Sequence, residues 1–447
     1  MENYNDYFKG KKITIMGLGV LGRGVAYTKF LASQGAILTV TDLKTQDALK
    51  SSLKELAQFS NIKFVLGEHR LSDFQNRDMI IKSAGVPLDS PYITEARKNK
   101  IPIEMDASLF ARCAPNVTIV GVTGTRGKSM TTMLIYEILK ANEKLLKQKV
   151  YVGGNVRGMS TLPLLSKVKQ GDIVVLELDS WQLQGFGESK ISPQISVFTS
   201  FMPDHMNYYK NDVKKYFADK ANIFKYQKKG DMLIVRPDMK KLIPKTTKST
   251  LIVANKKTVA GWSFVVPGEH QRENLACAVE VAKQFDIPMS KIKTAVKNFK
   301  GVEGRLQYVK TVKGVKIYND NNATTPEATV AGLEALGNLK KKNIILIAGG
   351  ADKGLEITPL IKAIDKYCKA VVLLNGQNTT GTEKLLSQKL KVESCKVKNL
   401  KESIKTATGV ARRGDIILFS PAFASFGMFT NEYDRNDQFI KIIKKLK

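Results

Sequence analysis

A glycine-rich segment that ends in Gly127-Lys128-Ser129 has the residue types and spacing of a phosphate-binding loop. In such a loop, backbone N–H groups converge on phosphate oxygens, a lysine reaches the terminal phosphates and a hydroxyl binds magnesium. An apolar run precedes the segment, and a helix can begin after it, whose positive N-terminal end adds to the attraction. The candidate nucleotide-binding residues are Gly124, Thr125, Gly127, Lys128, Ser129 and Met130. Val122 stands where the general pattern has glycine, so an ordinary turn is the alternative; we expect nucleotide hydrolysis or transfer.

A second glycine-rich segment, residues 17–22, lies between two β-type runs near the N-terminus. The first run ends at Met16 and, after a helical stretch, the second ends at Asp42, which gives the βαβ pattern of dinucleotide-binding folds. The glycines allow close approach of a pyrophosphate, and Asp42 stands where a ribose hydroxyl is usually held. By itself this pattern favours an NAD-dependent dehydrogenase or a structural turn. Together with the phosphate loop, it favours two substrates that each carry a nucleotide.

Three polar residues follow predicted strands in the middle of the chain. Glu177 ends one apolar run, and Asp204 and His205 follow another. The carboxyl ends of parallel strands are where α/β folds bind ligands, and a carboxylate at that edge suits magnesium. Each residue alone could be a structural polar residue. With Lys128 and Ser129, they predict a magnesium and triphosphate site.

Alternating β-type and helical segments predict an α/β protein with several domains. A chain of 447 residues is too long for one ordinary domain. A proline-containing stretch at residues 113–116 and a glycine-punctuated turn at 299–304 predict the boundaries. We expect domains at residues 1–114, 115–300 and 301–447.

The composition limits the classes of function. The formal net charge is +30, but the lysines are spread through every segment and aromatic residues are not interleaved with them, so we expect no nucleic-acid binding. Four scattered cysteines and only three histidines argue against a zinc site. No apolar run approaches the ~20 residues that span a bilayer, and the first residues are polar, unlike a secretory signal. We therefore expect a cytoplasmic protein without membrane association.

Further motifs, in order along essentially the whole chain, make the sequence resemble the ATP-dependent Mur ligases of peptidoglycan synthesis. Besides the phosphate loop, the motifs lie at residues 83–91, 153–155, 177–183, 204–206, 268–270 with Asn274, 304–306, 319–320, 349–353 and 420–426. The resemblance implies a Rossmann-like N-terminal domain that holds a UDP-sugar, a central P-loop ATPase-type α/β domain that binds ATP, and a C-terminal Rossmann-like α/β domain that holds an amino acid.

The chemistry implied by the resemblance is ATP-dependent amide-bond formation. The γ-phosphoryl group of ATP passes to the carboxylate of UDP-MurNAc-L-alanine, and the amine of D-glutamate attacks the resulting acyl phosphate. By the resemblance, Lys128 contacts the β and γ phosphates, Ser129 and Glu177 bind one Mg²⁺ ion, and His205 helps to position a second. Lys220 matches a lysine that carbon dioxide carbamylates, and its carbamate would be a further metal ligand.

The resemblance also implies which residues bind the substrates. Asn155 would hold the sugar nucleotide near its reacting carboxylate, and Asn274 would contact adenine. Arg305 and Asp320 would approach ATP when the third domain closes. The residues expected at the sugar nucleotide or at the amino acid are Gly19, Val20, Leu21, Asp42, Asn155, Thr324, Lys353 and Ser425. We expect a monomer whose partners are UDP-MurNAc-L-alanine and glutamate.

Four positions depart from the family pattern. Asn322 stands where lysine is usual, Gly427 where aspartate is usual, and Glu432 where a phenylalanine lines the glutamate site; Leu21 replaces a small hydroxyl residue near the expected uracil. L-glutamate or another amino acid are therefore alternatives to D-glutamate. Folylpolyglutamate synthesis and NAD-dependent dehydrogenation are less favoured, because the first domain carries the nucleotide pattern and the chain also carries the phosphate loop.

Overall fold

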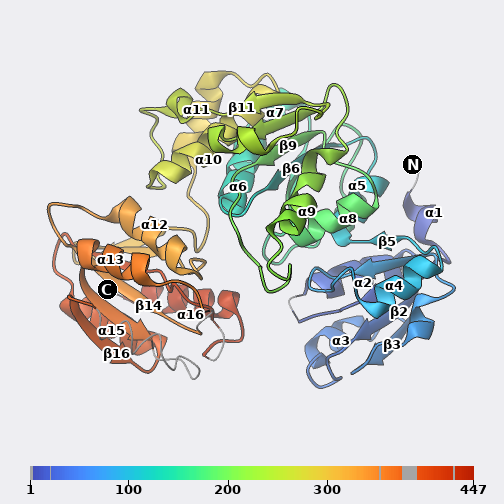
Figure 1. The fold of residues 1–447 in the computed structure, drawn as a ribbon, viewed down its shortest axis with the longest axis horizontal. Coiled ribbons are helices and arrows are strands. Elements are labelled where there is room, and N and C mark those ends of the chain that lie inside the picture. The colour runs from blue at the N-terminus through green and yellow to red at the C-terminus, as the bar shows by residue number, and fades with distance from the viewer. Residues whose placement is uncertain (1–3, 21, 352–353, 375–389, 426–427, 447) are drawn as a thin grey trace. The chain divides into compact units, whose positions relative to one another are not determined.

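The computed structural model describes residues 4–20, 22–351, 354–374, 390–425 and 428–446. The chain divides into two compact units, Met1–Ala260 with Glu273–Val296, and Gly261–Arg272 with Lys297–Lys447. Both are built from sheets flanked by helices (Figure 1). The first unit holds what the sequence predicts as two domains, and the predicted boundaries at 114 and 300 stay predictions.

The first sheet of the first unit has the strand order β3-β2-β1-β4-β5 in the described residues, and its strands are parallel. The strands are β1 (Lys12–Met16), β2 (Ile37–Asp42), β3 (Ile62–Leu66), β4 (Met79–Lys82) and β5 (Ile103–Glu104). The accompanying helices are α1 (Tyr4–Phe8), α2 (Arg23–Ser33), α3 (Lys50–Leu56), η1 (Leu71–Phe74), α4 (Pro91–Lys98) and α5 (Asp106–Cys113). The strand order reverses at β1, so the glycine-rich loop after β1 lies at the switch point where such sheets bind ligands.

The second sheet of this unit is also parallel, with the order β11-β10-β9-β6-β8-β7 in the described residues. The strands are β6 (Thr118–Thr123), β7 (Val150–Gly154), β8 (Ile173–Glu177), β9 (Ile195–Phe198), β10 (Met232–Val235) and β11 (Thr250–Val253). The helices are α6 (Lys128–Lys140), α7 (Glu143–Leu146), η2 (Leu162–Ser166), α8 (Ser180–Glu188), α9 (Val213–Lys225), η3 (Pro237–Leu242), η4 (Lys256–Val259), α10 (Glu269–Lys283) and α11 (Met289–Asn298). Buried apolar side chains of both sheets, such as Ile13, Val40, Val174 and Leu176, belong to one continuous core.

The sheet of the second unit has the order β12-β13-β17-β14-β15-β16 in the described residues, with β12 antiparallel to β13 and the other pairs parallel. The strands are β12 (Gln307–Val312), β13 (Val315–Asn319), β14 (Ile344–Gly349), β15 (Cys368–Leu374), β16 (Glu393–Val397) and β17 (Ile416–Phe419). The helices are α12 (Pro326–Leu336), α13 (Thr358–Tyr367), α15 (Leu400–Val410) and α16 (Glu432–Lys445).

Successive residues of β14 pack on opposite faces of this sheet, because side chains alternate along a strand. Leu346 lies in the core formed with α12 and α13, whereas Ile345 and Ile347 lie in the core formed with α15 and α16. Helices therefore cover both faces, and the predicted α/β class is confirmed.

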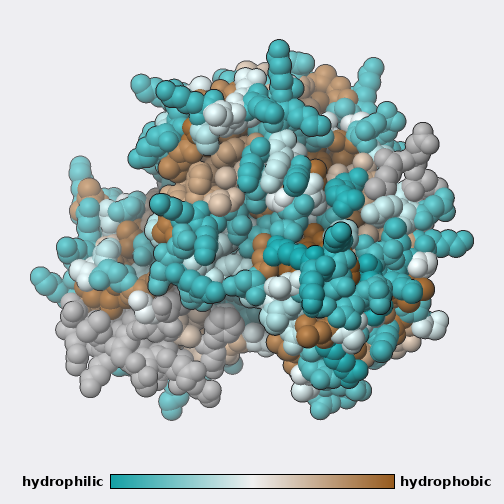
Figure 2. Space-filling model, turned by 45° about the vertical axis from the view of Figure 1, so that its right-hand side comes forward, coloured by the Kyte–Doolittle hydropathy of each residue, from teal (hydrophilic) through white to brown (hydrophobic). Residues whose placement is uncertain are grey.

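The visible surface in Figure 2 is mainly hydrophilic with scattered hydrophobic residues. Exposed apolar side chains such as Leu43 and Leu339 come from distant parts of the chain, which is normal for a protein surface. In the part of the chain that the structure describes, no helix combines the length and the apolar character that a bilayer crossing requires.

Candidate active site

The phosphate loop joins β6 to α6, and its glycines are required by its geometry. Gly127 caps α6 in a left-handed conformation with φ 89°, and Gly124 has φ 147°. A Cβ atom on Gly124 would collide with the Thr199 hydroxyl, and one on Gly127 would collide with the side-chain oxygen of Asn274. Val122, which departs from the general loop pattern, is a buried residue of β6. The strand therefore continues further toward the loop than in the general pattern.

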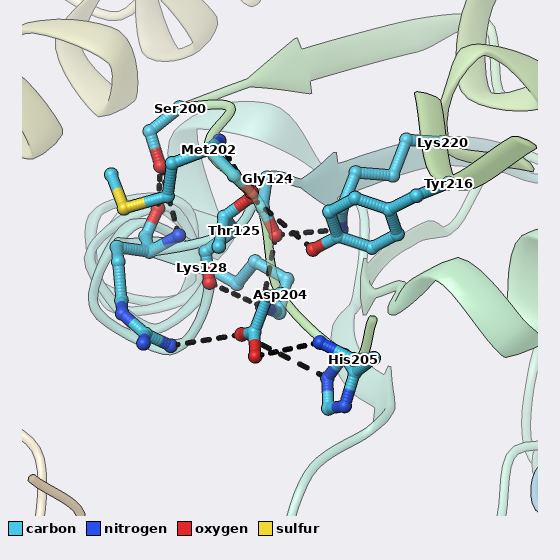
Figure 3. A network of polar contacts seen from close by, with 10 residues as sticks. Gly124, Thr125, Lys128, Ser200, Met202, Asp204, His205, Tyr216 and Lys220 are labelled. Atoms are coloured by element: carbon cyan, nitrogen blue, oxygen red, sulfur yellow. Dashed lines mark hydrogen bonds and ion pairs between the residues drawn. The ribbon is translucent and has the colours of Figure 1, made fainter. Parts of the chain in front are cut away.

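The residues that follow β9 hold this loop in place (Figure 3). The Thr125 N–H donates to the Ser200 carbonyl at 2.7 Å, and the Arg126 N–H donates to Ser200 Oγ at 2.8 Å. Thr199 Oγ1 lies 2.6 Å from the Arg126 carbonyl. The loop backbone is thus fixed before any ligand binds.

Two lysine side chains meet at the same loop carbonyl. Lys128 Nζ donates to the carbonyls of Gly124 at 2.9 Å and Thr125 at 3.1 Å, and Lys220 Nζ donates to Gly124 at 2.8 Å. Lys220 is 1% exposed, and its amine lies 4.9 Å from the centre of the Tyr216 ring. Burial, and then the charge of Lys128, hold the pKa of Lys220 well below its ordinary value. The Lys220 amine is therefore easier to deprotonate than an ordinary lysine.

His205 lies beside the loop in a left-handed conformation, with φ 56°. Its backbone N–H donates to Asp204 Oδ1 at 2.9 Å, and Asp204 Oδ2 accepts from Arg126 Nη1 at 3.2 Å, which ties His205 to the loop (Figure 3). The His205 ring lies 4.7 Å from the Trp181 ring. Burial lowers the pKa of His205, partly opposed by Asp204, and so favours the neutral imidazole.

Glu177 and Ser129 supply oxygen atoms of the kind that magnesium prefers. Glu177 ends β8, opposite Val122 of β6 and Gly154 of β7, and is 4% exposed. Ser129 lies in the first turn of α6. A buried carboxylate and a hydroxyl at the carboxyl edge of a sheet fit Mg²⁺, which takes its remaining ligands from water and phosphate. Within the described residues, no group of three His, Cys, Asp or Glu side chains forms a metal cluster.

The glycine-rich loop after β1 is held by Asp42. The Gly19 N–H donates to Asp42 Oδ2 and the Lys44 N–H donates to Asp42 Oδ1, both at 2.9 Å. Val20, by contrast, is 52% exposed on the loop. Asp42 therefore supports the loop backbone, and its role in substrate binding stays a prediction. Leu21 lies outside the described residues.

Asn155 directly follows β7 and is joined to two elements. Its N–H donates to the Glu177 carbonyl at 2.7 Å, and its side-chain Oδ1 accepts from Arg23 Nη2 at 3.1 Å. Arg23 is the first residue of α2, directly after the first glycine-rich loop. Sequence reasoning missed Arg23 and Arg126, although both lie in or next to a glycine-rich loop, which was the available signal.

The second unit contains the remaining candidate residues. Asp320 Oδ1 accepts from the Leu306 N–H and Oδ2 from Ser420 Oγ, both at 2.9 Å, which places Arg305 next to the strand end that carries Asp320. Burial raises the pKa of Asp320 to about 7. Thr324 and Ser425 lie in the segments that follow β13 and β17, whose carboxyl ends are neighbours in the sheet.

Two of the departures from the family pattern, Asn322 and Glu432, lie in the described part of the second unit. The Asn322 N–H donates to the Gly304 carbonyl at 3.0 Å, and the carbonyl of Glu432 accepts from Asn321 Nδ2 at 2.9 Å. Lys353 and Gly427 lie outside the described residues.

Comparison with protein families matches three consecutive parts of the chain. Residues 11–104 match the Mur ligase MurD-like N-terminal domain, 122–262 the Mur ligase middle domain, and 304–423 the Mur ligase glutamate ligase domain.

Individual proteins agree with these family matches. The chain is 35% identical to the UDP-N-acetylmuramoylalanine--D-glutamate ligase of Roseiflexus sp. (strain RS-1), over 97% of this chain and 98% of that protein. It is 33% identical to the protein of that name from Borreliella burgdorferi (strain ATCC 35210), over 99% of each. The MurF ligase of Thermotoga maritima, solved in complex with ADP, shares the fold with a TM-score of 0.58 at 17% identity, over 98% of this chain and 95% of that one.

Proposed function

Because this chain belongs to the Mur ligase family, we propose that it uses ATP to join D-glutamate to UDP-MurNAc-L-alanine in the cytoplasmic synthesis of peptidoglycan precursors. The observation that carries the proposal is the phosphate loop, with Lys128 and the buried Lys220 both directed at the Gly124 carbonyl and His205 tied to the loop through Asp204 and Arg126 (Figure 3). This arrangement suits transfer of a phosphoryl group.

The reaction needs two anions to approach each other. The carboxylate of UDP-MurNAc-L-alanine attacks the γ-phosphorus of ATP, ADP leaves, and an acyl phosphate forms. The amine of glutamate then attacks the acyl carbon, phosphate leaves, and the amine gives up a proton as the amide forms. Lys128 lies where it can leave the loop carbonyls and neutralise the β and γ phosphates. The backbone N–H groups at the start of α6 add to the positive electrostatic potential that attracts the phosphates.

Ser129 and Glu177 would hold one magnesium ion, and His205 would help to hold a second. When bound, these ions neutralise charge on the triphosphate and on the reacting carboxylate. An unmodified Lys220 ammonium does not fit a cation site, because like charges repel. A carbamate on Lys220 does fit, since it replaces the amine by an anionic oxygen donor.

Carbamylation of Lys220 is supported by its burial. The neutral amine attacks carbon dioxide, an N–C bond forms, and one proton leaves to water. Only the neutral amine can react in this way, and the environment of Lys220 favours that form by lowering its pKa. The nearby Tyr216 ring and the Gly124 carbonyl hold the amine in a single place.

We propose sites for the UDP portion, for adenine and for the amino acid on different parts of the chain. Gly19, Val20 and Asp42 would hold the UDP portion at the switch point of the first sheet. Asn274, which packs against Gly127, would contact adenine. We assign Arg305 and Asp320 to the ATP side of the second unit, and Thr324, Lys353 and Ser425 to the carboxylates of the amino acid.

D-glutamate is the amino acid in the names of both relatives. Asn322 does not carry the positive charge of the usual lysine, and Glu432 adds a negative one, so L-glutamate or another amino acid is the alternative. We propose that the protein acts as a monomer on these metabolites.

The test is phosphate release from ATP by the purified protein with UDP-MurNAc-L-alanine and Mg²⁺, in the presence of D-glutamate, L-glutamate or no amino acid. Product mass identifies the amide. Turnover that requires D-glutamate supports the proposal. Turnover with another amino acid alone keeps the reaction and changes the substrate, and no turnover with any of them overturns the proposal.

A further inference from the structure

We propose that Arg23 is a positioning residue that fixes the side-chain amide of Asn155, so that the NH₂ group of Asn155 faces the sugar-nucleotide substrate. The inference rests on the proposed function, because it deepens the part that Asn155 has in that reaction. Arg23 and Asn155 are 132 positions apart in the sequence; Arg23 begins α2, between β1 and β2 of the first sheet, and Asn155 directly follows β7 of the second.

The guanidinium of Arg23 makes two hydrogen bonds to one short segment. Nη2 donates to Asn155 Oδ1 at 3.1 Å, and Nε donates to the Met159 carbonyl at 3.2 Å. Two donors from one planar group to two acceptors fix its orientation as well as its position. The side chain is half-buried, so these bonds are partly shielded from water.

The contact determines which way the Asn155 amide points. A guanidinium has only donors, so the atom of the amide that faces Arg23 must be the oxygen. The NH₂ group then points away from Arg23, where it can donate to a carboxylate or acyl-phosphate oxygen of the substrate. Without Arg23, the amide can turn over and present its oxygen to the anionic substrate, which is repulsive.

The chain on both sides of this segment is also held by hydrogen bonds, which support the position of Asn155. Asp106, at the start of α5, accepts hydrogen bonds from Ser160 Oγ and from the N–H groups of Thr161 and Leu162. Thr161 Oγ1 in turn accepts from the Gly154 N–H at 2.9 Å.

The position of Arg23 also connects Asn155 to the first glycine-rich loop. Gly22, the residue before Arg23, caps α2 in a left-handed conformation with φ 81°. A sugar nucleotide bound at this loop would lie near the start of α2, so its binding and the orientation of Asn155 would depend on neighbouring residues. Arg23 therefore couples recognition of the nucleotide to placement of the reacting carboxylate.

The test is a double-mutant cycle with Arg23→Met, Asn155→Ala and the combined variant, measured as kcat and KM for each substrate. Arg23→Met keeps the aliphatic stem and removes the donors. We expect kcat to fall on the order of tenfold, with the KM for ATP unchanged. In the Arg23→Met background, Asn155→Ala should cost at least about fivefold less than in the wild type.

Two further variants separate positioning from general support of the structure. Asn155→Asp keeps the acceptor for Arg23 but has no NH₂ group, so it should lose as much activity as Asn155→Ala. Arg23→Lys keeps one donor and should recover part of the activity. Lys29→Met is the matched control, because Lys29 lies on the same helix and pairs with Glu55 rather than with the site; its kcat should equal that of the wild type.

Additive effects of Arg23→Met and Asn155→Ala in an active wild-type enzyme would overturn the inference and leave the proposed function intact. Full activity of Asn155→Asp would overturn it in the same way. Wild-type protein that makes no product with UDP-MurNAc-L-alanine would instead overturn the proposed function, and this inference with it. Thermal unfolding of every variant identifies any that has lost its fold. Arg23→Lys replaces Arg23→Met in the cycle if the latter is unfolded, and Asn155→Asp replaces Asn155→Ala in the same way.

Discussion

The two glycine-rich loops of the first unit have similar backbones and different electrostatic surroundings. Each follows an interior strand of a parallel sheet and ends in a left-handed glycine that caps a helix, Gly22 with φ 81° and Gly127 with φ 89°. The loop at 124–127 is contacted by the amines of Lys128 and Lys220. The loop at 17–22 is held instead by the carboxylate of Asp42.

This difference teaches that a glycine turn before a helix does not determine its ligand. Amines next to a loop attract a triphosphate, whereas a carboxylate repels it and suits hydroxyl groups of a ribose. The charged side chains come from other parts of the chain. The side chains packed beside each loop therefore underlie our proposal that the two loops bind different nucleotides.

The largest effect is expected from the lysine of the phosphate loop. Lys128→Met should lower kcat on the order of 10³-fold, because a charge that stabilises the phosphoryl-transfer transition state is removed. Steady-state phosphate release measures this effect. Lys140→Met, at the other end of α6 and paired with Glu143, is the control and should keep wild-type activity. If kcat fell equally in Lys128→Met and Lys140→Met, the position of the charge beside the phosphate loop would not matter, which would contradict the comparison of the two loops.

The buried lysine beside the same loop should give the next largest effect. Lys220→Ala should lose activity on the order of 10²-fold, because it removes the amine on which the proposed carbamate, a ligand of the proposed second metal ion, would form. Added formate or acetate should restore part of the activity, since a small carboxylate can supply the oxygen. Phosphate release with and without formate measures this, with Lys214→Ala, an exposed lysine of the same helix, as the control. Full activity of Lys220→Ala without formate would exclude the carbamate.

Alanine substitutions of the two capping glycines compare the loops directly. Both Gly22→Ala and Gly127→Ala place a side chain at positive φ, which costs about 1–2 kcal/mol. Only the second also forces a Cβ against Asn274, while a Cβ on Gly22 meets no heavy atom of the described residues within 4 Å. We expect Gly127→Ala to destabilise the protein by about 1–3 kcal/mol more than Gly22→Ala, measured by urea unfolding. If Gly127→Ala and Gly22→Ala destabilised the protein equally, the loop at 124–127 or the Asn274 side chain would have to move and remove the clash.

A buried lysine at the end of β4 gives a smaller, pH-dependent effect. Lys82 is the last residue of β4, which pairs with β1. Its amine donates to the Val86 carbonyl at 3.0 Å, and burial lowers its pKa to about 8. The unfolded chain binds the proton more tightly, so the stability of the wild type rises from pH 8 toward pH 10 by about 1 kcal/mol per pH unit. Lys82→Met should lack this rise, as measured by urea unfolding at pH 7.5 and 9.5. If the free energy of unfolding changed equally with pH in the wild type and in Lys82→Met, the lowered pKa of Lys82 would be contradicted.

Sequence reasoning placed the strands well, because long apolar runs with glycine after them are strong local signals. The run predicted to end at Met16 is β1 (Lys12–Met16), the run predicted to end at Asp42 is β2 (Ile37–Asp42), and the run predicted to end at Glu177 is β8 (Ile173–Glu177). The family resemblance is confirmed along the whole chain. The roles of individual site residues stay predictions, which the experiments above test.

Contacts between distant segments could not be predicted from local patterns. The positions of Lys220 and Asn274 against the phosphate loop depend on how α9 and α10 pack beside β6 and α6. The same holds for the ion pair of Arg126 with Asp204. Each of these contacts depends on the direction of a side chain, which is determined only by packing in the folded protein.

The sequence by itself determined the α/β class, the two glycine-rich loops and the family, since these depend on hydrophobic periodicity and on the backbone freedom of glycine. The tertiary structure decided what surrounds each loop. Burial lowers the pKa of Lys220, Asp42 accepts a hydrogen bond from the backbone of the first loop, and Arg23 donates to the side-chain oxygen of Asn155. Solvation and hydrogen-bond direction depend on every neighbouring atom in space, and no stretch of sequence contains all of those neighbours.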